Sequence, residues 1–424
     1  MGKISVDLLI REASELVTVK GFSGQPARGD EMGEAGIIPG GSVAVYNGKI
    51  VSVGTHEEVM DQIEITTVTE VVDARGMVVM PGFIDAHTHL VYAGSREHEL
   101  TLKLAGMSYL EILERGGGIL NTVAATRAAS RSELLNQAQR RVNNMLSMGT
   151  TTVEGKSGYG LTTFTELMSL EIMAEINRTH PLDIIPTFMG AHTYPSEYKD
   201  RPSEYVNLVC TEMIPAVANQ GLARFCDVFC EQGAFNADDS RRILKCAMEH
   251  GLEGKIHADE LAVSGGSLLA GELRVRSAEH LLEITSQGIE SLAAAGVIGV
   301  LLPATSFYLA KGRFAPAREM TKQGIPLALG TDCNPGSSPT ESMQLVLTLA
   351  CLYLKLSPAE SIVAATINSA HALGVEKLVG SLENGKQADM LVMEIPNHAY
   401  LPYHFGGNHV NRVIKRGRTV FRKE

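Results

Sequence analysis

The side chains best suited to chemistry in this sequence are two histidines separated by one residue. His87 and His89 lie in the segment 83–90, FIDAHTHL, whose apolar residues favour a β-strand. Because strand side chains alternate between two faces, both imidazoles are expected to point to the same side. Such a pair can be two hydrogen-bonded core histidines, or it can be half of a metal site. The pair alone does not decide between these alternatives.

Two further residues extend the pair to a predicted metal site. His257 lies in the predicted strand 254–260, and Asp332 ends the predicted strand 326–332. Asp332 by itself could be a turn residue before 334–336, a role that Asp often fills. Three imidazoles and one carboxylate together suit one Zn²⁺ or Fe ion. The predicted ligands are His87, His89, His257 and Asp332.

Glu260 and His280 provide groups for acid–base chemistry beside this predicted site. Glu260 follows His257 by three residues, and His280 lies in the predicted strand 277–281; either could instead be a surface residue. Hydrolysis of an amide-like C–N bond needs an activated water, stabilisation of a negative oxygen, and a proton for the leaving nitrogen. We expect Asp332 to take the proton of water, His280 to stabilise the oxygen, and Glu260 to orient the substrate and carry the proton.

The chain between residues 81 and 374 supplies the elements that would bring these residues together. Apolar strands alternate there with helical segments such as 133–148, 166–178 and 239–250. The eight predicted strands are 83–90, 150–155, 184–190, 226–231, 254–260, 277–281, 298–304 and 326–332. Eight strands alternating with helices predict an α/β fold, a (β/α)8 TIM-type barrel, whose active site lies at the carboxyl ends of the strands.

Both ends of the chain have the character of short strands. Residues 1–80 contain β-branched runs with turn signals at 47–48 and 75–76, and residues 375–424 contain a third turn signal at 416–417. Neither end is long enough to bury a core of its own, and the termini of a chain often lie close together. We therefore predict one composite β-sandwich domain from 1–80 plus 375–424, and a catalytic barrel domain from 81–374.

Composition narrows the choice of partners. Apolar residues make up 44% and charged residues 20% of the 424 residues, with a net charge of −11, as expected of a globular protein that repels nucleic acid and anionic membranes. The first sixteen residues do not resemble a signal peptide, and the apolar run 293–302 is too short to span a bilayer. Six cysteines without a CxxC pair predict reduced thiols. We expect a cytoplasmic protein with a small-molecule substrate.

Five sequence motifs resemble those of the amidohydrolase superfamily. They are PGFIDAHTHL at 81–90, HADE at 257–260, AEH at 278–280, LGTDCNPG at 329–336 and GSLENGKQAD at 380–389. Within this superfamily, the whole chain is similar to the enzymes of histidine degradation that open an imidazolone ring. The additional motifs are SREHEL at 95–100, GGGILNTV at 116–123, EGKSGYGL at 154–161 and MGAHTYP at 189–195.

The resemblance implies a substrate, a cofactor and a set of binding residues. The implied reaction is hydrolysis of 4-imidazolone-5-propanoate to N-formimino-L-glutamate by a homodimer that holds one Zn²⁺ or Fe ion per subunit. Arg96 would bind the propanoate carboxylate, which a guanidinium can do in bidentate fashion; without the resemblance it could be an ordinary loop arginine. The other residues implied to contact substrate or product are Tyr159, His192, Glu260, Asn334, Gly336 and Ser337.

One departure from related enzymes bears on the number of metal ions. Binuclear amidohydrolases carry a carbamylated lysine at the end of the fourth strand, where this chain has Cys230 and Glu231. A second ion is therefore not expected, and Lys156, after the second strand, is predicted to be a structural or pocket lysine.

Two other functions share much of this pattern. A deaminase of a cytosine- or guanine-like base would use the same histidines and carboxylates, and a catalytically inactive scaffold could keep the fold. Arg96 and the region of Tyr159 favour a substrate with a carboxylate over a neutral base.

Overall fold

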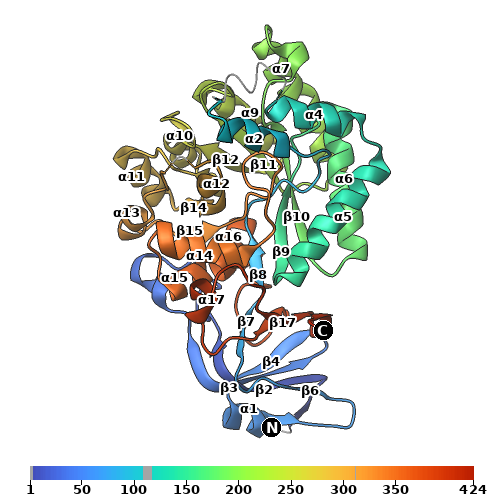
Figure 1. Ribbon diagram of the computed structural model, residues 1–424, viewed down its shortest axis with the longest axis vertical. Helices are drawn as coiled ribbons and strands as arrows, with labels where there is room; N and C mark the ends of the chain where they lie inside the picture. Colours follow the sequence, from blue (N-terminus) through green and yellow to red (C-terminus); the bar gives the residue numbers. More distant parts are fainter. Residues whose placement is uncertain (1–2, 108–116, 311) are drawn as a thin grey trace.

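The computed structural model describes residues 3–107, 117–310 and 312–424, without the side chain of Lys103. Gly116, the first residue of the motif 116–123, lies outside the described residues. The described part of the chain forms a barrel of parallel strands with a smaller sheet beneath it, and both termini lie at that sheet (Figure 1).

Eight parallel strands form the barrel in sequence order, which confirms the predicted fold class. They are β8 (Phe83–Asp85), β9 (Thr150–Lys156), β10 (Asp183–Ala191), β11 (Phe225–Cys230), β12 (Glu253–Ala258), β13 (Ser277–His280), β14 (Ile298–Leu301) and β15 (Leu327–Leu329). Each of the eight predicted strands overlaps one of these, and the predicted strand 298–304 runs past the end of β14 into the helix that begins at Pro303. Backbone bonds close the barrel between its first and last strands, from Ala86 N to Leu329 O at 3.3 Å and from His89 N to Cys333 O at 3.0 Å.

The predicted strands 83–90 and 326–332 are too long at their carboxyl ends. β8 ends at Asp85 and β15 ends at Leu329, so His87, His89 and Asp332 follow the strands instead of lying within them. In the predicted strand 326–332 the physical reason is local backbone geometry, because Asp332 has a left-handed φ of 53°, which an extended strand does not contain. The three side chains are therefore placed by loops at the closing seam of the barrel.

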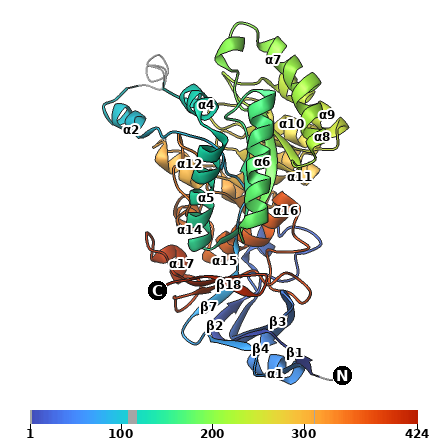
Figure 2. The ribbon, with the colours of Figure 1, turned by 90° about the vertical axis from the view of Figure 1, so that its right-hand side faces the viewer.

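Helices surround the barrel, and their starts follow the capping signals of the sequence. Ser130 and Glu133 form a capping box at α5 (Arg131–Ser147), and Thr162 caps α6 (Thr163–Thr179). These two helices lie side by side on one flank (Figure 2). The other helices before β12 are α2 (Glu97–Leu104), α4 (Ile119–Ala128), α7 (Pro202–Leu208), α8 (Ile214–Gln220) and α9 (Ala237–Glu249). Those after it are α10 (Gly266–Leu273), α11 (Ser286–Ala295), α12 (Pro303–Tyr308), α13 (Ala317–Lys322), α14 (Met343–Tyr353), α15 (Pro358–Val363) and α16 (Ser369–Leu373). None of the helices in the described ranges is long and apolar enough to cross a bilayer.

Strands from both ends of the chain join in one mixed sheet. Its order is β18-β17-β16-β7-β2-β3-β4, with β6 also paired to β2. The members are β2 (Leu8–Val17), β3 (Ile37–Tyr46), β4 (Lys49–Thr55), β6 (Glu70–Asp73), β7 (Val78–Pro81), β16 (Met390–Met393), β17 (Val410–Lys415) and β18 (Arg418–Arg422). A separate pair, β1 (Ile4–Ser5) and β5 (Ile63–Glu64), flanks α1 (His56–Gln62), and α17 (Tyr400–Tyr403) precedes β17.

This sheet supports the predicted sandwich in part. Alternate side chains divide between two apolar cores, so that Met80 and Leu391 pack with the barrel while Val79 and Met390 pack in a separate cluster on the other face. The turns at 47–48 and 416–417 form hairpins, whereas the turn at 75–76 does not, because β6 and β7 both run parallel to β2. The domain boundaries at 80 and 374 stay predictions.

Candidate active site and metal centre

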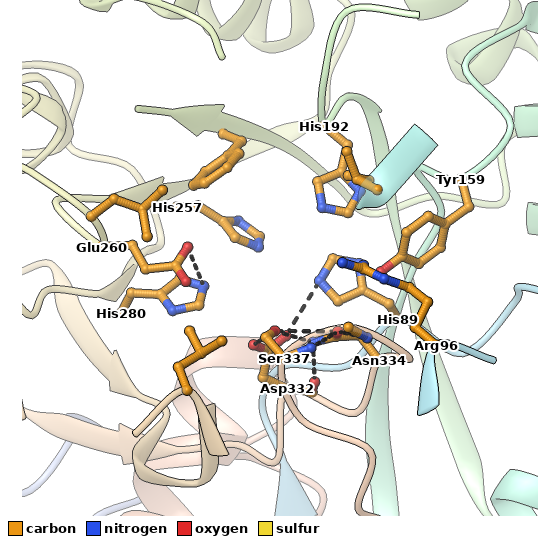
Figure 3. Close-up of a pocket in the computed structure, with 15 residues that line it drawn as sticks. His89, Arg96, Tyr159, His192, His257, Glu260, His280, Asp332, Asn334 and Ser337 are labelled. Atoms are coloured by element: carbon orange, nitrogen blue, oxygen red, sulfur yellow. Dashed lines mark hydrogen bonds and ion pairs between the residues drawn. The ribbon is translucent and has the colours of Figure 1, made fainter. Parts of the chain in front are cut away.

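A cavity of about 500 Å³ lies at the carboxyl ends of the barrel strands (Figure 3). Every residue predicted to contact the substrate lines it, together with three of the four predicted metal ligands. The predicted residues in its wall are His89, Arg96, Tyr159, His192, His257, Glu260, His280, Asp332, Asn334, Gly336 and Ser337. His87 is fully buried and lies outside this lining. Sequence reasoning thus selected residues that the fold brings together.

The four predicted metal ligands converge. Asp332 Oδ1 lies 3.4 Å from His87 Nε2 and 3.5 Å from His89 Nε2. The ring of His257 packs against that of His87, with 4.5 Å between their centroids. The four side chains come from the ends of the first, fifth and eighth strands, which only a closed barrel brings to one place.

Carboxylates hold the far nitrogens of two of these imidazoles. His87 Nδ1 is ion-paired with Glu279, and His257 Nδ1 lies 3.1 Å from Asp227 Oδ1. The hydrogen bond of His257 and the ion pair of His87 orient the two rings and leave the other nitrogen of each for a metal. The Nε2 atoms of His87 and His257 are both buried without a hydrogen-bond partner, which is costly unless a ligand supplies one. The residues present therefore fit a divalent ion.

Burial and neighbouring groups set the protonation states of Asp332 and His280. Burial alone would raise the pKa of Asp332, but His87 and the hydroxyl of Thr305, which donates to Oδ2 at 2.6 Å, hold it below its ordinary range. Burial lowers the pKa of His280 well below its ordinary value. At neutral pH, Asp332 is therefore a carboxylate and His280 a neutral imidazole that can donate one hydrogen bond.

Glu260 owes its position to a tight turn after β12. Asp259 has a left-handed φ of 51°, and the next two amides, of Glu260 and Leu261, donate to Glu231 Oε2 at 3.0 and 2.8 Å. The carboxylate of Glu260 then lies 3.8 Å from His280 Nε2. Glu231 was singled out in the sequence only as the place of a missing lysine, and its contact with the turn was not predicted.

Arg96 is held on the opposite side of the cavity from Glu260 and His280 (Figure 3). Its Nε and Nη2 atoms donate to the two carboxylate oxygens of Glu99, each at 2.8 Å. Gly118 N donates to the same carboxylate at 2.7 Å. A side chain at Gly336 would overlap with the guanidinium and displace it from this position. Asn334 accepts from the amides of Gly336 and Ser337, both at 2.8 Å, and so shapes this loop.

Tyr159 and His192 form a further wall of the cavity. His192 Nδ1 lies 3.0 Å from the carbonyl oxygen of Gly158, which can only accept, so Nδ1 carries the proton. Burial lowers the pKa of His192 to about 3, which keeps the ring neutral. The ring stacks on His89 with 4.8 Å between centroids. His192 thus has Nε2 available as a hydrogen-bond acceptor.

Comparison with known proteins identifies the family to which this site belongs. The model of the family described as "Amidohydrolase family" matches residues 78–420. The chain belongs to the amidohydrolase family. Proteins named imidazolonepropionase from Alkaliphilus metalliredigens and Geobacillus kaustophilus are each 50% identical to it, over 99% and 97% of both chains, respectively.

Solved structures share the fold of this amidohydrolase. An adenosine deaminase from Xanthomonas campestris with bound Zn aligns with a TM-score of 0.74 at 21% identity, over 99% of this chain and 93% of the other. The E. coli guanine deaminase aligns with a TM-score of 0.75 at 17% identity, over 98% and 99%. At such identities the likeness concerns the fold alone.

Below the cavity of this amidohydrolase lies a set of buried charges that the sequence did not reveal. Lys156, predicted to be a structural or pocket lysine, lies outside the cavity lining and pairs with Glu154, Asp227 and Glu279. The available signal was charged residues inside apolar strands, as in CDVFC at 226–230. That pattern does not say which residues of neighbouring strands they meet.

Proposed function

We propose that this amidohydrolase opens the imidazolone ring of 4-imidazolone-5-propanoate and releases N-formimino-L-glutamate. The observation that carries the proposal is a single cavity with Arg96 on one side, Glu260 and His280 on the other, and His89 and Asp332 between them. A guanidinium suits the propanoate carboxylate of this substrate. The name shared by relatives at 50% identity supports the same reaction.

Each step of the reaction has a residue suited to it. The ion would be held by His87, His89, His257 and Asp332, and when bound it would lower the pKa of a water and polarise the ring carbonyl.

The remaining steps fall to side chains around the cavity. Asp332 accepts a proton of the attacking water, and His280 donates a hydrogen bond to the carbonyl oxygen as it becomes negative. As the oxygen of the water bonds to the carbonyl carbon, Glu260 carries this proton from Asp332 to the ring nitrogen, and the C–N bond between that nitrogen and the carbonyl carbon breaks. Arg96 holds the propanoate away from the reacting carbon.

A deaminase is the competing function on this fold, since two structural neighbours bear that title. A neutral purine or pyrimidine has no carboxylate for the guanidinium of Arg96 to bind. The presence of Arg96 in the cavity therefore favours the imidazolone as substrate. The test is to incubate purified protein with 4-imidazolone-5-propanoate, cytosine or guanine and to follow the ultraviolet absorbance of each. We expect loss of the imidazolone signal alone. Turnover of a base, or of none of the three, would overturn the proposal.

We further propose one Zn²⁺ or Fe ion per chain. The four proposed ligands include His87, His89 and Asp332, whose ligand atoms lie within 4.8 Å of one another. The nearby carboxylates of Glu154, Asp227 and Glu279 are paired with Lys156. Elemental analysis of the purified protein should give one ion per chain. Two tightly held ions, both required for activity, would contradict this.

We also propose that the chain acts in the cytoplasm as a homodimer. The resemblance to imidazolonepropionases supports the dimer. The six cysteines, all free thiols, support a reducing compartment. Light scattering on the purified protein would give the mass of a dimer, and a monomer at micromolar concentration would contradict it.

A further inference from the structure

We propose that Lys156 is a positioning residue of the metal centre, acting through the two carboxylates that orient His87 and His257. This inference rests on the proposed function, because it concerns the proposed metal ligands. Lys156 is on β9 and fully buried, and its ion pairs are with carboxylates and not with either imidazole. Its role therefore has to be argued through its partners.

The ammonium of Lys156 lies among three carboxylates. Its Nζ is 2.6 Å from Asp227 Oδ2, 2.9 Å from Glu279 Oε2 and 2.9 Å from Glu154 Oε2. All four side chains are fully buried. Although burial would lower the pKa of Lys156, the three carboxylates hold it above its ordinary value, so the group stays an ammonium.

Two of these carboxylates are the ones that hold the metal-site imidazoles. Asp227 uses Oδ2 for Lys156 and Oδ1 for His257 Nδ1, and Glu279 uses Oε2 for both Lys156 and His87 Nδ1. Lys156 therefore bridges the supports of two imidazoles that come from different strands. A carboxylate that holds an imidazole N–H fixes both the tautomer and the orientation of the ring.

Without Lys156, the support of both imidazoles would change. Asp227 and Glu279 would repel each other at close range in a buried site, and one would turn away from its imidazole. This movement would release the Nδ1 of His87 or His257 and misplace its Nε2. A second lysine, Lys255, does not replace the bridge, because it forms ion pairs with Glu154 and Glu279 and not with Asp227.

The ammonium also occupies space that an ion could otherwise take. Two groups of side chains around it have ligand atoms within 4.8 Å of one another: His87 with Glu154 and Glu279, and Asp227 with His257 and Glu279. Each group shares an imidazole with the proposed centre. An internal cation at this place satisfies the carboxylates and leaves both Nε2 atoms for the ion at the cavity.

The test compares metal binding by the parent protein and Lys156→Met. Affinity for Zn²⁺ is measured by competition with a chromophoric chelator, and the geometry of the site is followed through the visible absorption of bound Co²⁺. We expect affinity to fall about 10–100-fold, as for loss of groups that orient metal ligands, and the Co²⁺ spectrum to change. Unchanged or tighter binding with the parent spectrum would overturn the proposal.

Two further variants separate positioning from stability. Lys415→Met removes another buried lysine that bridges two carboxylates, Asp183 and Asp389, at the sheet; it should lower the melting temperature and keep the parent metal affinity. Lys156→Met combined with Glu154→Gln restores the charge of the cluster but not the bridge. We expect it to regain stability and still bind Zn²⁺ weakly.

Each remaining outcome has a single meaning. If the double variant recovered both stability and affinity, Lys156 would only balance charge, and the positioning role would be wrong. If the parent itself bound no ion, the proposed function would fail. A parent that binds one ion beside a Lys156→Met variant that binds it equally well would refute only the inference about Lys156.

Discussion

The two nitrogens of each active-site imidazole have separate tasks in this protein. In His87, His257 and His192, Nδ1 faces a carboxylate or a backbone carbonyl. The other nitrogen is thereby directed to the proposed ion or to the cavity. The role of each histidine thus depends on the partner of its Nδ1 as well as on the imidazole itself. Substitutions can therefore be chosen that change one of the two and keep the other.

Replacing Arg96 with Met should raise KM and affect kcat less. The guanidinium is proposed to bind a carboxylate remote from the reacting carbon. Its loss therefore weakens binding of the substrate and of the transition state by similar amounts. A charge-assisted contact of this kind is worth about 2–4 kcal/mol, or roughly 30–1,000-fold in KM. Steady-state kinetics measure it, with Arg75→Met as the control, because Arg75 is an exposed arginine in the turn between β6 and β7. An unchanged KM would favour the deaminase alternative.

Glu260→Ala and His257→Ala should have different effects although the two positions are three residues apart. Glu260 is proposed to transfer a proton, so its loss should reduce kcat by about 10²–10⁴-fold and leave the ion bound. His257 is a proposed ligand, so its loss should remove ion and activity together. Activity and elemental analysis on the same samples decide the matter. A metal-depleted Glu260 variant would make Glu260 a ligand.

At the scale of elements, the sequence was sufficient to predict the eight strands of the barrel. It was not sufficient to predict where the first and last strands end, at the place where the barrel closes. The eight strands were predictable because each is an apolar run between helical segments. The ends of the first and last were not, because the seam depends on contacts between them: Asp85 accepts from Thr331 N at 2.9 Å and from its hydroxyl at 2.6 Å. The partners lie 246 residues apart, beyond the reach of any local pattern.

The candidate site likewise has one part that the sequence predicts and one part that it does not. Residues that face the cavity carry distinctive motifs, and the structure brings them together as expected. The residues beneath it do not, since Asp227 and Glu279 are single carboxylates in apolar strands. Even the strand register would not show what they hold, because it pairs Asp227 with Lys255 and Glu279 with His257. Their contacts with His257 and His87, respectively, are made by side chains inside the barrel.

The loop after β9 is an element whose shape depends on one buried carboxylate. Glu166, on α6, accepts from the amides of Gly158, Gly160 and Leu161 at 2.8–2.9 Å, and this loop carries Tyr159. Glu166→Gln keeps one oxygen acceptor and turns the other into a donor, so at least one amide loses its partner at a cost of about 1–3 kcal/mol. We expect KM to rise several-fold while the ion stays bound.

The matched control for this prediction is Glu175→Gln. Glu175 lies on the same helix but forms a partly exposed ion pair with Arg131, so its kinetics should equal those of the parent. Equal KM values for the Glu166 and Glu175 variants would show that the loop keeps its shape without the carboxylate.

At the scale of the whole molecule, the junction between barrel and sheet lies at the opposite end of the barrel from the cavity. The cavity lies at the carboxyl ends of the strands. Asp183, which begins β10 at the opposite end, pairs with Lys415 at 2.7 Å and with Arg416 of the sheet. Lys415 also pairs with buried Asp389. The contacts that join barrel and sheet are therefore remote from the reacting atoms.

Lys415→Met should lower the free energy of unfolding by about 3–5 kcal/mol, because it leaves a buried carboxylate without its cation. We expect kcat, KM and metal content to stay at parent values.

The pH dependence of this effect follows from Asp183. Burial raises the pKa of this carboxyl, but Lys415 and Arg416 together bring it below its ordinary value of 3.8. A depressed carboxyl pKa stabilises the folded state above the unfolded value and ceases to do so as the pH falls through the folded value. The difference in stability between parent and variant should therefore persist from pH 8 to pH 5 and narrow below 3.8. Denaturant titrations across this range measure it, and a loss of activity in the folded variant would show that the junction influences the active site.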